Sequence, residues 1–154
     1  MLKKNLLILF CLSLTLCLPS YAKKNPAASA LEIRQMQTRT YDIKNKKQLM
    51  EAIVNVLQDR DYLLNESSYN LGVVSGYKEC QEKIFMGSHY VRYETSVQVN
   101  ELGNKYKVRT NFIKKNIDPL GNSTTQIDIQ NPEEFYRDFF SQLDKSLFIE
   151  SQGI

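Results

Sequence analysis

Two segments of the chain carry hydrophobic residues at the three- and four-residue spacing of a helix. The first is predicted over residues 46–60, and its apolar stripe comprises Leu49, Ile53, Val56 and Leu57. Asn45 and Gln48 stand where an N-cap residue and its reciprocal partner stand. Asp61 follows at the position of a left-handed residue that ends the helix.

The second helix is predicted near the C-terminus and is rich in aromatic residues. Asn131 is expected to cap it, with Pro132 at the first helical position and Glu134 as the partner in a capping box. Its apolar positions are Tyr136, Phe140, Leu143 and Leu147, widened by Phe135 and Phe139. A helix with such a face is expected to cover a sheet.

Alternation of apolar and polar residues predicts several strands. The first is expected over residues 34–42, where Met36, Thr38 and Thr40 share one side. Residues 62–64 and 72–77 form two short extended runs around a polar stretch. They fit either a hairpin or a bulged strand.

The clearest β pattern lies in the second half of the chain. Residues 91–100 and 106–112 alternate strictly on either side of Gly103-Asn104, which predicts an antiparallel hairpin with one dry and one wet face. After a turn signal at residues 119–122, Thr125, Ile127 and Ile129 indicate a last strand.

The order of these elements predicts an α+β fold in a single domain over residues 31–151. We expect an antiparallel sheet of about four or five strands in the order β-α-β-β-β-β-α, with two helices packed on one face. Residues 23–30 have neither pattern and suit a flexible tether.

The N-terminus has the three parts of a secretory signal peptide. Lys3 and Lys4 precede an apolar stretch over residues 6–18, and small residues follow at Ser20 and Ala22. Residues 1–22 are therefore predicted to be removed by a cut between Ala22 and Lys23, which leaves the chain in the periplasm.

Two other interpretations of this segment fit the residues less well. A retained membrane anchor would need about 20 apolar residues, and the stretch here is shorter. A lipid anchor at Cys17 is disfavoured because Leu16 is large and the following residues stay apolar. Cys80 is then the single cysteine of the mature chain, and it is expected to be buried or paired with another chain.

The net charge is small, but one segment of the chain is basic. The formal net charge is +3, of which the signal accounts for two, so the mature chain is nearly neutral and unlike a nucleic-acid binder. A basic cluster nevertheless follows the hairpin turn at Lys105, Lys107, Arg109, Lys114 and Lys115. It is interpreted either as a solvated face that resists edge pairing or as a contact for an acidic partner or anionic lipid head groups.

Catalytic and cofactor chemistry finds little support. His89 is the single histidine, and no nucleophile motif accompanies it. One histidine and Cys80 cannot supply the three or four ligands of a zinc site. A phosphate-binding loop is also absent from the sequence pattern, because Gly72 and Gly76 flank valines in a strand and do not precede a helix. We therefore expect a protein that is not an enzyme and that has no cofactor or metal.

Three segments together resemble a family of uncharacterised Gram-negative periplasmic proteins and lipoproteins. They are Arg-Gln-Met-Gln-Thr-Arg-Thr-Tyr at residues 34–41, Val-Leu-Gln-Asp at residues 56–59, and the aromatic segment at residues 135–148. The resemblance implies an envelope role without catalytic residues. Members tend to have Gly-Phe where this chain has Asp61-Tyr62, and many begin at a lipidated cysteine.

A second, fold-level likeness concerns the strand, the helix and the extended Leu-Gly-Val-Val segment at residues 71–74. These resemble the small lipoprotein subunits of outer-membrane β-barrel assembly machinery. Together the observations predict a structural or accessory subunit of an envelope complex for secretion or outer-membrane assembly. It would associate with the outer membrane through protein partners and dock by an exposed sheet edge or the basic strand face. The alternative is a module that holds a small apolar ligand or lipid between the sheet and the aromatic helix, around Tyr136 and Phe140.

Overall fold

The computed structural model describes residues 29–84, 87–118, 120, 123–129 and 131–152. In chain order its elements are α2 (Ala30–Met36), β1 (Thr38–Tyr41), α3 (Lys46–Asp59), β2 (Leu63–Ser68), β3 (Val73–Ile84), β4 (Gly87–Leu102), β5 (Lys105–Ile117), β6 (Ser123–Ile127) and α4 (Pro132–Ser151). The predicted signal peptide, its cut between Ala22 and Lys23, Cys17 and residues 23–28 of the tether lie outside the described residues.

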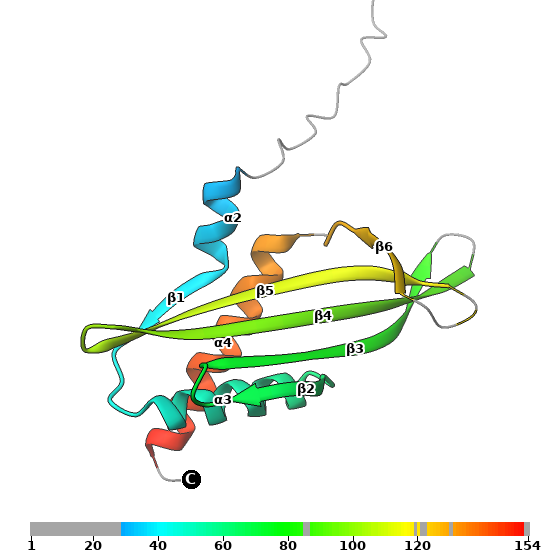
Figure 1. The fold of residues 1–154 in the computed structure, drawn as a ribbon. Coiled ribbons are helices and arrows are strands. Elements are labelled where there is room, and N and C mark those ends of the chain that lie inside the picture. The colour runs from blue at the N-terminus through cyan, green and yellow to red at the C-terminus, as the bar shows by residue number, and fades with distance from the viewer. Residues whose placement is uncertain (1–28, 85–86, 119, 121–122, 130, 153–154) are drawn as a thin grey trace, which may run out of the picture.

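The strands form one antiparallel sheet in the order β1-β5-β4-β3-β2, and β6 pairs with β5 further along the same edge as β1. Helices α3 and α4 pack against one face of this sheet (Figure 1). The predicted α+β class with an antiparallel sheet is therefore confirmed. The predicted element order is wrong in two details, because a helix precedes the first strand and the sheet has six strands.

The first described element is a helix where the sequence predicted a strand over residues 34–42. Ser29 caps it: the Glu32 backbone N–H donates to the Ser29 hydroxyl at 3.3 Å, and the Ser29 N–H donates to the Glu32 carboxylate at 2.6 Å. This reciprocal box stabilises the first turn and outweighs the alternation of residues 34–37. Only Thr38–Tyr41 extends as a strand, and Ser29 and Ala30 belong to the helix rather than to a tether.

Helix α3 forms as predicted. The Asn45 side chain accepts hydrogen bonds from the backbone N–H groups of Lys47 and Gln48 at 3.0 and 3.5 Å. The predicted apolar stripe is buried, and the helix ends at Asp59, one residue earlier than expected. Asp61 has a φ of 64°, which confirms the left-handed residue predicted after the helix.

Helix α4 begins at Pro132 as predicted, but its cap differs. Asn131 has a left-handed backbone, with φ 51° and ψ 60°, and its side chain makes no capping hydrogen bond. An N-cap side chain ordinarily reaches the first turn from an extended backbone, so the predicted box of Asn131 and Glu134 is wrong. The aromatic stripe is confirmed, and its buried members are Tyr136, Phe139, Phe140, Leu143 and Leu147.

Two hairpins build the centre of the sheet. β4 and β5 form the predicted one, with Val99 opposite Val108 and a left-handed turn residue at Gly103 (φ 60°). β2 and β3 form a second hairpin, with a bulge between Leu64 and Glu66. At 12 residues, β3 is twice as long as the run predicted there.

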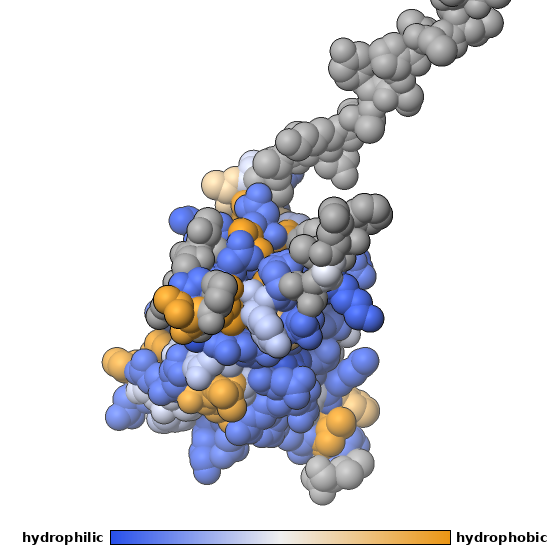
Figure 2. All heavy atoms as spheres, turned by 90° about the vertical axis from the view of Figure 1, so that its right-hand side faces the viewer, coloured by the Kyte–Doolittle hydropathy of each residue, from blue (hydrophilic) through white to orange (hydrophobic). Residues whose placement is uncertain are grey.

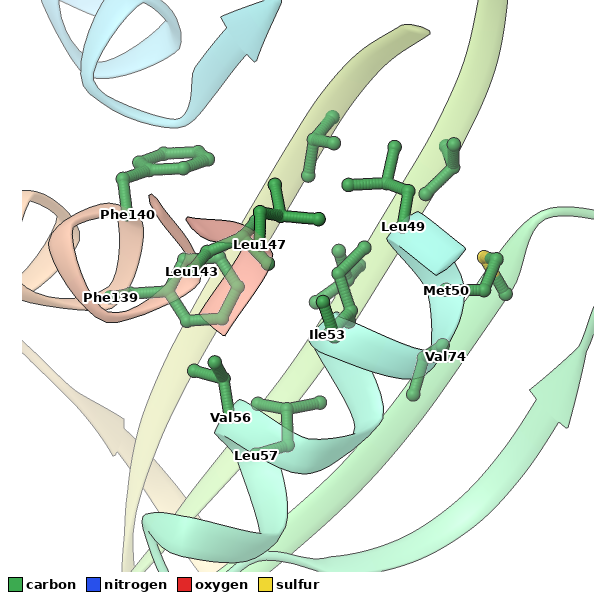
Figure 3. Packing of buried hydrophobic residues seen from close by; sticks show 14 of the residues in the cluster. Leu49, Met50, Ile53, Val56, Leu57, Val74, Phe139, Phe140, Leu143 and Leu147 are labelled. Atoms are coloured by element: carbon green, nitrogen blue, oxygen red, sulfur yellow. The ribbon is translucent and has the colours of Figure 1, made fainter. Parts of the chain in front are cut away.

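The core lies between the sheet and the two helices. Figure 3 shows Leu49 and Ile53 of α3 and Phe139 and Leu143 of α4 pointing into this layer, and all four are 0% exposed. The strand residues in the same buried cluster include Val74, Val97, Val99 and Val108. Full burial of each such side chain contributes about 2 kcal/mol, so this packing holds α3 and α4 on one face.

Candidate docking surface

The face of the sheet opposite the helices carries most of the predicted contact residues. Directly opposed residues of antiparallel strands share a face, so Lys107 and Arg109 lie on the same side as Thr40 and Thr38 of β1. Val108 between them is 0% exposed on the helix side. We call this surface the open face; by strand register its side chains include Thr38, Thr40, Tyr77, Glu79, Arg92, Glu94, Ser96, Gln98, Asn100, Lys107, Arg109, Asn111, Ile113 and Lys115.

Lys114, one of the five predicted contact residues, is not on the open face. Its side chain is 8% exposed on the helix side of β5, and its Nζ lies 2.6 Å from Oε2 of Glu82. The Tyr93 hydroxyl donates to the other oxygen of Glu82 at 2.6 Å. Burial alone raises the pKa of Glu82, but the bonds from Lys114 and Tyr93 outweigh it and hold this pKa below its usual value. Lys114 therefore serves an internal ion pair.

Lys105 and Lys115 reach the surface, and each lies beside a carboxylate. Lys105 stands at the β4–β5 turn with its Nζ 3.4 Å from Asp42. Lys115 lies on the open face with its Nζ 2.7 Å from Glu94. The positive charge of both residues is therefore neutralised locally.

Lys107 and Arg109 differ from these cations. Both are exposed, and neither has a carboxylate partner among the residues that the structure describes. Arg109 donates one long hydrogen bond, 3.5 Å, to the side-chain oxygen of Gln37. The residues opposite them on β4 are the neutral Asn100 and Gln98. We call Thr38, Thr40, Gln98, Asn100, Lys107 and Arg109 the basic half of the open face.

Beyond the basic half, the open face carries charges in opposite-sign pairs, apart from Lys83 near the end of β3, which has no ion pair among the described residues. Arg92 of β4 bonds Glu79 of β3, and its guanidinium lies 5.0 Å from the centre of the Tyr77 ring. Lys115 of β5 bonds Glu94 of β4 in the same region. We call Tyr77, Glu79, Arg92, Glu94 and Lys115 the paired half of the open face.

Gln37 supports the basic half, and no pattern in the sequence singled it out. The stretch of β5 between its pairings with β1 and β6 bonds to other groups instead. The Gln37 carbonyl accepts from the Thr110 N–H at 2.9 Å, and the Tyr136 hydroxyl accepts from the Phe112 N–H at 3.4 Å. The Gln37 amide donates to the Tyr136 hydroxyl and to Asn111, both at 3.1 Å. These bonds fix the edge of β5 beside Arg109.

His89 and Cys80, the candidates for catalysis or metal binding, lie on the helix side of the sheet. His89 has its Nε2 4.0 Å from Oε2 of Glu82, so its recorded partner is a carboxylate. Cys80 on β3 is a partly exposed free thiol. Across the described ranges, no three side chains of the His, Cys, Asp and Glu types gather as metal ligands would. None of the described helices has the length and apolar character needed to cross a membrane.

Tyr136 and Phe140, the residues of the alternative ligand site, are packed in the core at 4% and 2% exposure. The Tyr136 ring centre lies 5.6 Å from that of Phe112, and the Phe140 ring centre lies 5.2 Å from that of Phe139. The surface pockets of the described residues lie away from these two side chains, for example in a groove between α3 and α4 and at the β4–β5 turn. The apolar-ligand alternative stays a prediction, and no described contact favours it.

Comparisons with known proteins add one distant likeness. No family model and no curated protein sequence matches the chain. Among solved structures, it is similar to a DUF4468 family protein from Bacteroides ovatus, whose crystal structure was determined at 1.49 Å resolution. The two chains are 10% identical, the similarity covers 71% of this chain and 84% of the other, and the TM-score is 0.44. We base no conclusion about function on this likeness.

Proposed function

We propose that this chain is a non-enzymatic accessory subunit of a bacterial envelope complex that docks an acidic partner protein on the basic half of its open face. One contrast carries the proposal: Lys105, Lys114 and Lys115 each meet a carboxylate, whereas Lys107 and Arg109 meet none among the described residues. Two exposed cations without counter-charges attract a carboxylate-bearing surface and speed its association.

The surroundings of these cations also suit a protein partner. The basic half combines arginine and lysine with the neutral hydrogen-bonding side chains of Thr38, Gln98 and Asn100. Such side chains can bond a partner surface without requiring a deep cavity. The sheet beneath is held by the Gln37 bonds, so the docking groups stand on a rigid element.

The envelope assignment rests on the sequence. A cleavable signal over residues 1–22, with the cut between Ala22 and Lys23, would deliver the chain to the periplasm. The resemblance to periplasmic proteins and lipoproteins supports the same compartment. Without a lipid at Cys17, association with the outer membrane would come through the partner.

The test is recovery of a partner from envelope fractions with an affinity-tagged chain. The double variant Lys107→Glu/Arg109→Glu reverses both charges, and we expect it to reduce partner recovery at least about tenfold. The matched control Arg137→Glu/Lys145→Glu makes the same change in charge at two exposed positions of α4, on the other side of the sheet, and should leave recovery unchanged.

Two outcomes would overturn the proposal. Equal recovery with both double variants would show that the partner docks elsewhere. If the purified chain bound vesicles containing phosphatidylglycerol through Lys107 and Arg109 while no protein was recovered, the basic half would serve lipid head groups instead.

A further inference from the structure

The edge of the sheet at β3 has a step. β2 pairs with β3 only between Val73 and Tyr77, and β3 continues to Ile84. Along residues 78–84, β4 lies on one side of β3, and the described strands place no neighbour on the other (Figure 1). Leu63, the first residue of β2, closes the step at one end with a side chain that is 63% exposed. Such an edge favours the addition of another strand.

The step is complementary to itself. If two copies of residues 78–84 lie antiparallel and cover each other fully, Glu79 of each copy stands opposite Lys83 of the other. Both positions belong to the same face of β3, as direct cross-strand pairing requires. Opposite charges in directly opposed positions stabilise a strand pair, and like charges destabilise it.

The side chains of Glu79 and Lys83 are both exposed and can both form a further ion pair. Lys83 is exposed and has no ion pair within the described part of the chain. Glu79 holds Arg92 through Oε1 alone, and its side chain is 42% exposed. The second carboxylate oxygen of Glu79 can therefore accept a bond from Lys83 of the second copy without loss of the Arg92 pair.

Neighbouring registers are less favourable. A shift of two residues one way places Lys83 opposite Tyr77, where Leu63 already pairs. It also sets Lys78 opposite Glu82, but these two side chains already bond the Arg60 carbonyl and Lys114 of their own chain. The same shift the other way places Glu82 opposite Glu82 of the second copy. A shift of one residue either sets Glu79 against Glu82 or leaves no pair of opposite charges. Full overlap of the two steps is thus the register that combines space with charge complementarity.

We infer that this chain pairs with a second copy of itself, antiparallel along residues 78–84 of β3, about a two-fold axis perpendicular to the sheet. This joins two six-stranded sheets into one, with both helix layers on one side and both open faces on the other. Figure 2 shows the side on which β3 ends as largely hydrophilic, with separate apolar patches. Five of the seven residues at positions 78–84 are charged or polar, so backbone bonds and charge pairs, rather than apolar burial, hold the copies together. The inference does not depend on the proposed envelope partner.

Sedimentation of the protein isolated from cells, over a concentration series, tests the pairing. We expect a monomer–dimer equilibrium in which Lys83→Glu and Glu79→Lys each raise the dissociation constant about tenfold, because each places two like-charged pairs across the axis. The combined variant E79K/K83E should restore the constant to within about threefold. Lys145→Glu makes the same charge change as Lys83→Glu but lies on α4, away from the edge, and should have no effect. A monomer at every concentration, or a dimer indifferent to the single variants, overturns the inference.

Disulfide trapping tests the register in a Cys80→Ser background. A mixture of chains carrying Glu79→Cys and chains carrying Lys83→Cys should form a cross-linked heterodimer, because the two thiols face each other. Either variant alone should not cross-link, since its thiols lie about 13 Å apart along the strands. Circular dichroism equal to that of the parent verifies the fold of each variant. Cross-linking of one variant with itself, or none in the mixture, contradicts the register.

Discussion

Lys114 and Lys115 follow one another in the chain, yet β5 sends their side chains to opposite faces of the sheet. Lys114 is 8% exposed and lies 2.6 Å from Glu82, while Lys115 is 29% exposed and lies 2.7 Å from Glu94. The two ion pairs have nearly the same length. Their surroundings differ, because water screens the pair on the open face more than the pair on the helix side. The helix side of the sheet therefore contributes more to stability, and the open face is the side that we propose for recognition.

The largest effect is expected where the helix side is most tightly packed. Phe139→Ala removes a ring that is 0% exposed and meets Phe112 at a centroid distance of 5.5 Å, so we expect a loss of about 4 kcal/mol. Phe148→Ala, on the same helix but 66% exposed, should change stability by less than about 0.5 kcal/mol. Urea denaturation measures both. Similar losses for the two variants would contradict the assignment of the buried side of α4 to the core.

An intermediate effect is expected from the two neighbouring lysines. Lys114→Ala leaves Glu82 partly buried without its cation, and should lower the free energy of unfolding by about 2 kcal/mol. Lys115→Ala removes a screened pair and should cost about 0.5 kcal/mol. Chemical denaturation at neutral pH compares them directly. If Lys115→Ala proved the more damaging variant, the assignment of the faces would be reversed.

The smallest effect is expected from acid. Because the pKa of Glu82 is lower in the folded chain than its usual value, its ionised form stabilises the fold above the usual carboxyl range of about 4.3, and this stability is lost as the pH falls below it. Between about pH 6 and about pH 3, the parent should lose more stability than Glu82→Gln, which has no carboxylate to protonate at this position. Urea denaturation at both pH values gives the difference. If Glu82→Gln lost more unfolding free energy than the parent over this pH range, the Glu82 carboxylate would not stabilise the fold.

The fold was predictable where a periodic pattern coincided with a cap or a turn. The stripe behind Asn45 located α3, and alternation around Gly103 located the β4–β5 hairpin. Helix α2 was not predicted, because it buries no residue and therefore has no apolar stripe in its sequence. Its start depends on the Ser29–Glu32 box, and the alternation that follows imitates a strand.

The candidate surface was predictable only in part. Alternation correctly placed Lys107 and Arg109 on the wet face of their strand. Lys114 was misjudged because β5 runs on to Ile117 beyond the alternating stretch, so that Lys114 shares the buried side of Phe112. The partners that neutralise Lys105 and Lys115 come from other elements, and the spacing along β5 does not reveal them.

The stretch of β5 between its pairings with β1 and β6 limits how far copies of this chain can assemble. Between its pairings with β1 and β6, the outer backbone of β5 gives its N–H groups to the Gln37 carbonyl and the Tyr136 hydroxyl. A fibril needs long open edges on both sides of the sheet. Among the described strands, the opposite side offers the separate short edges of β1 and β6 alone. If two copies pair through β3, growth would therefore stop at a closed dimer and would not continue into a polymer.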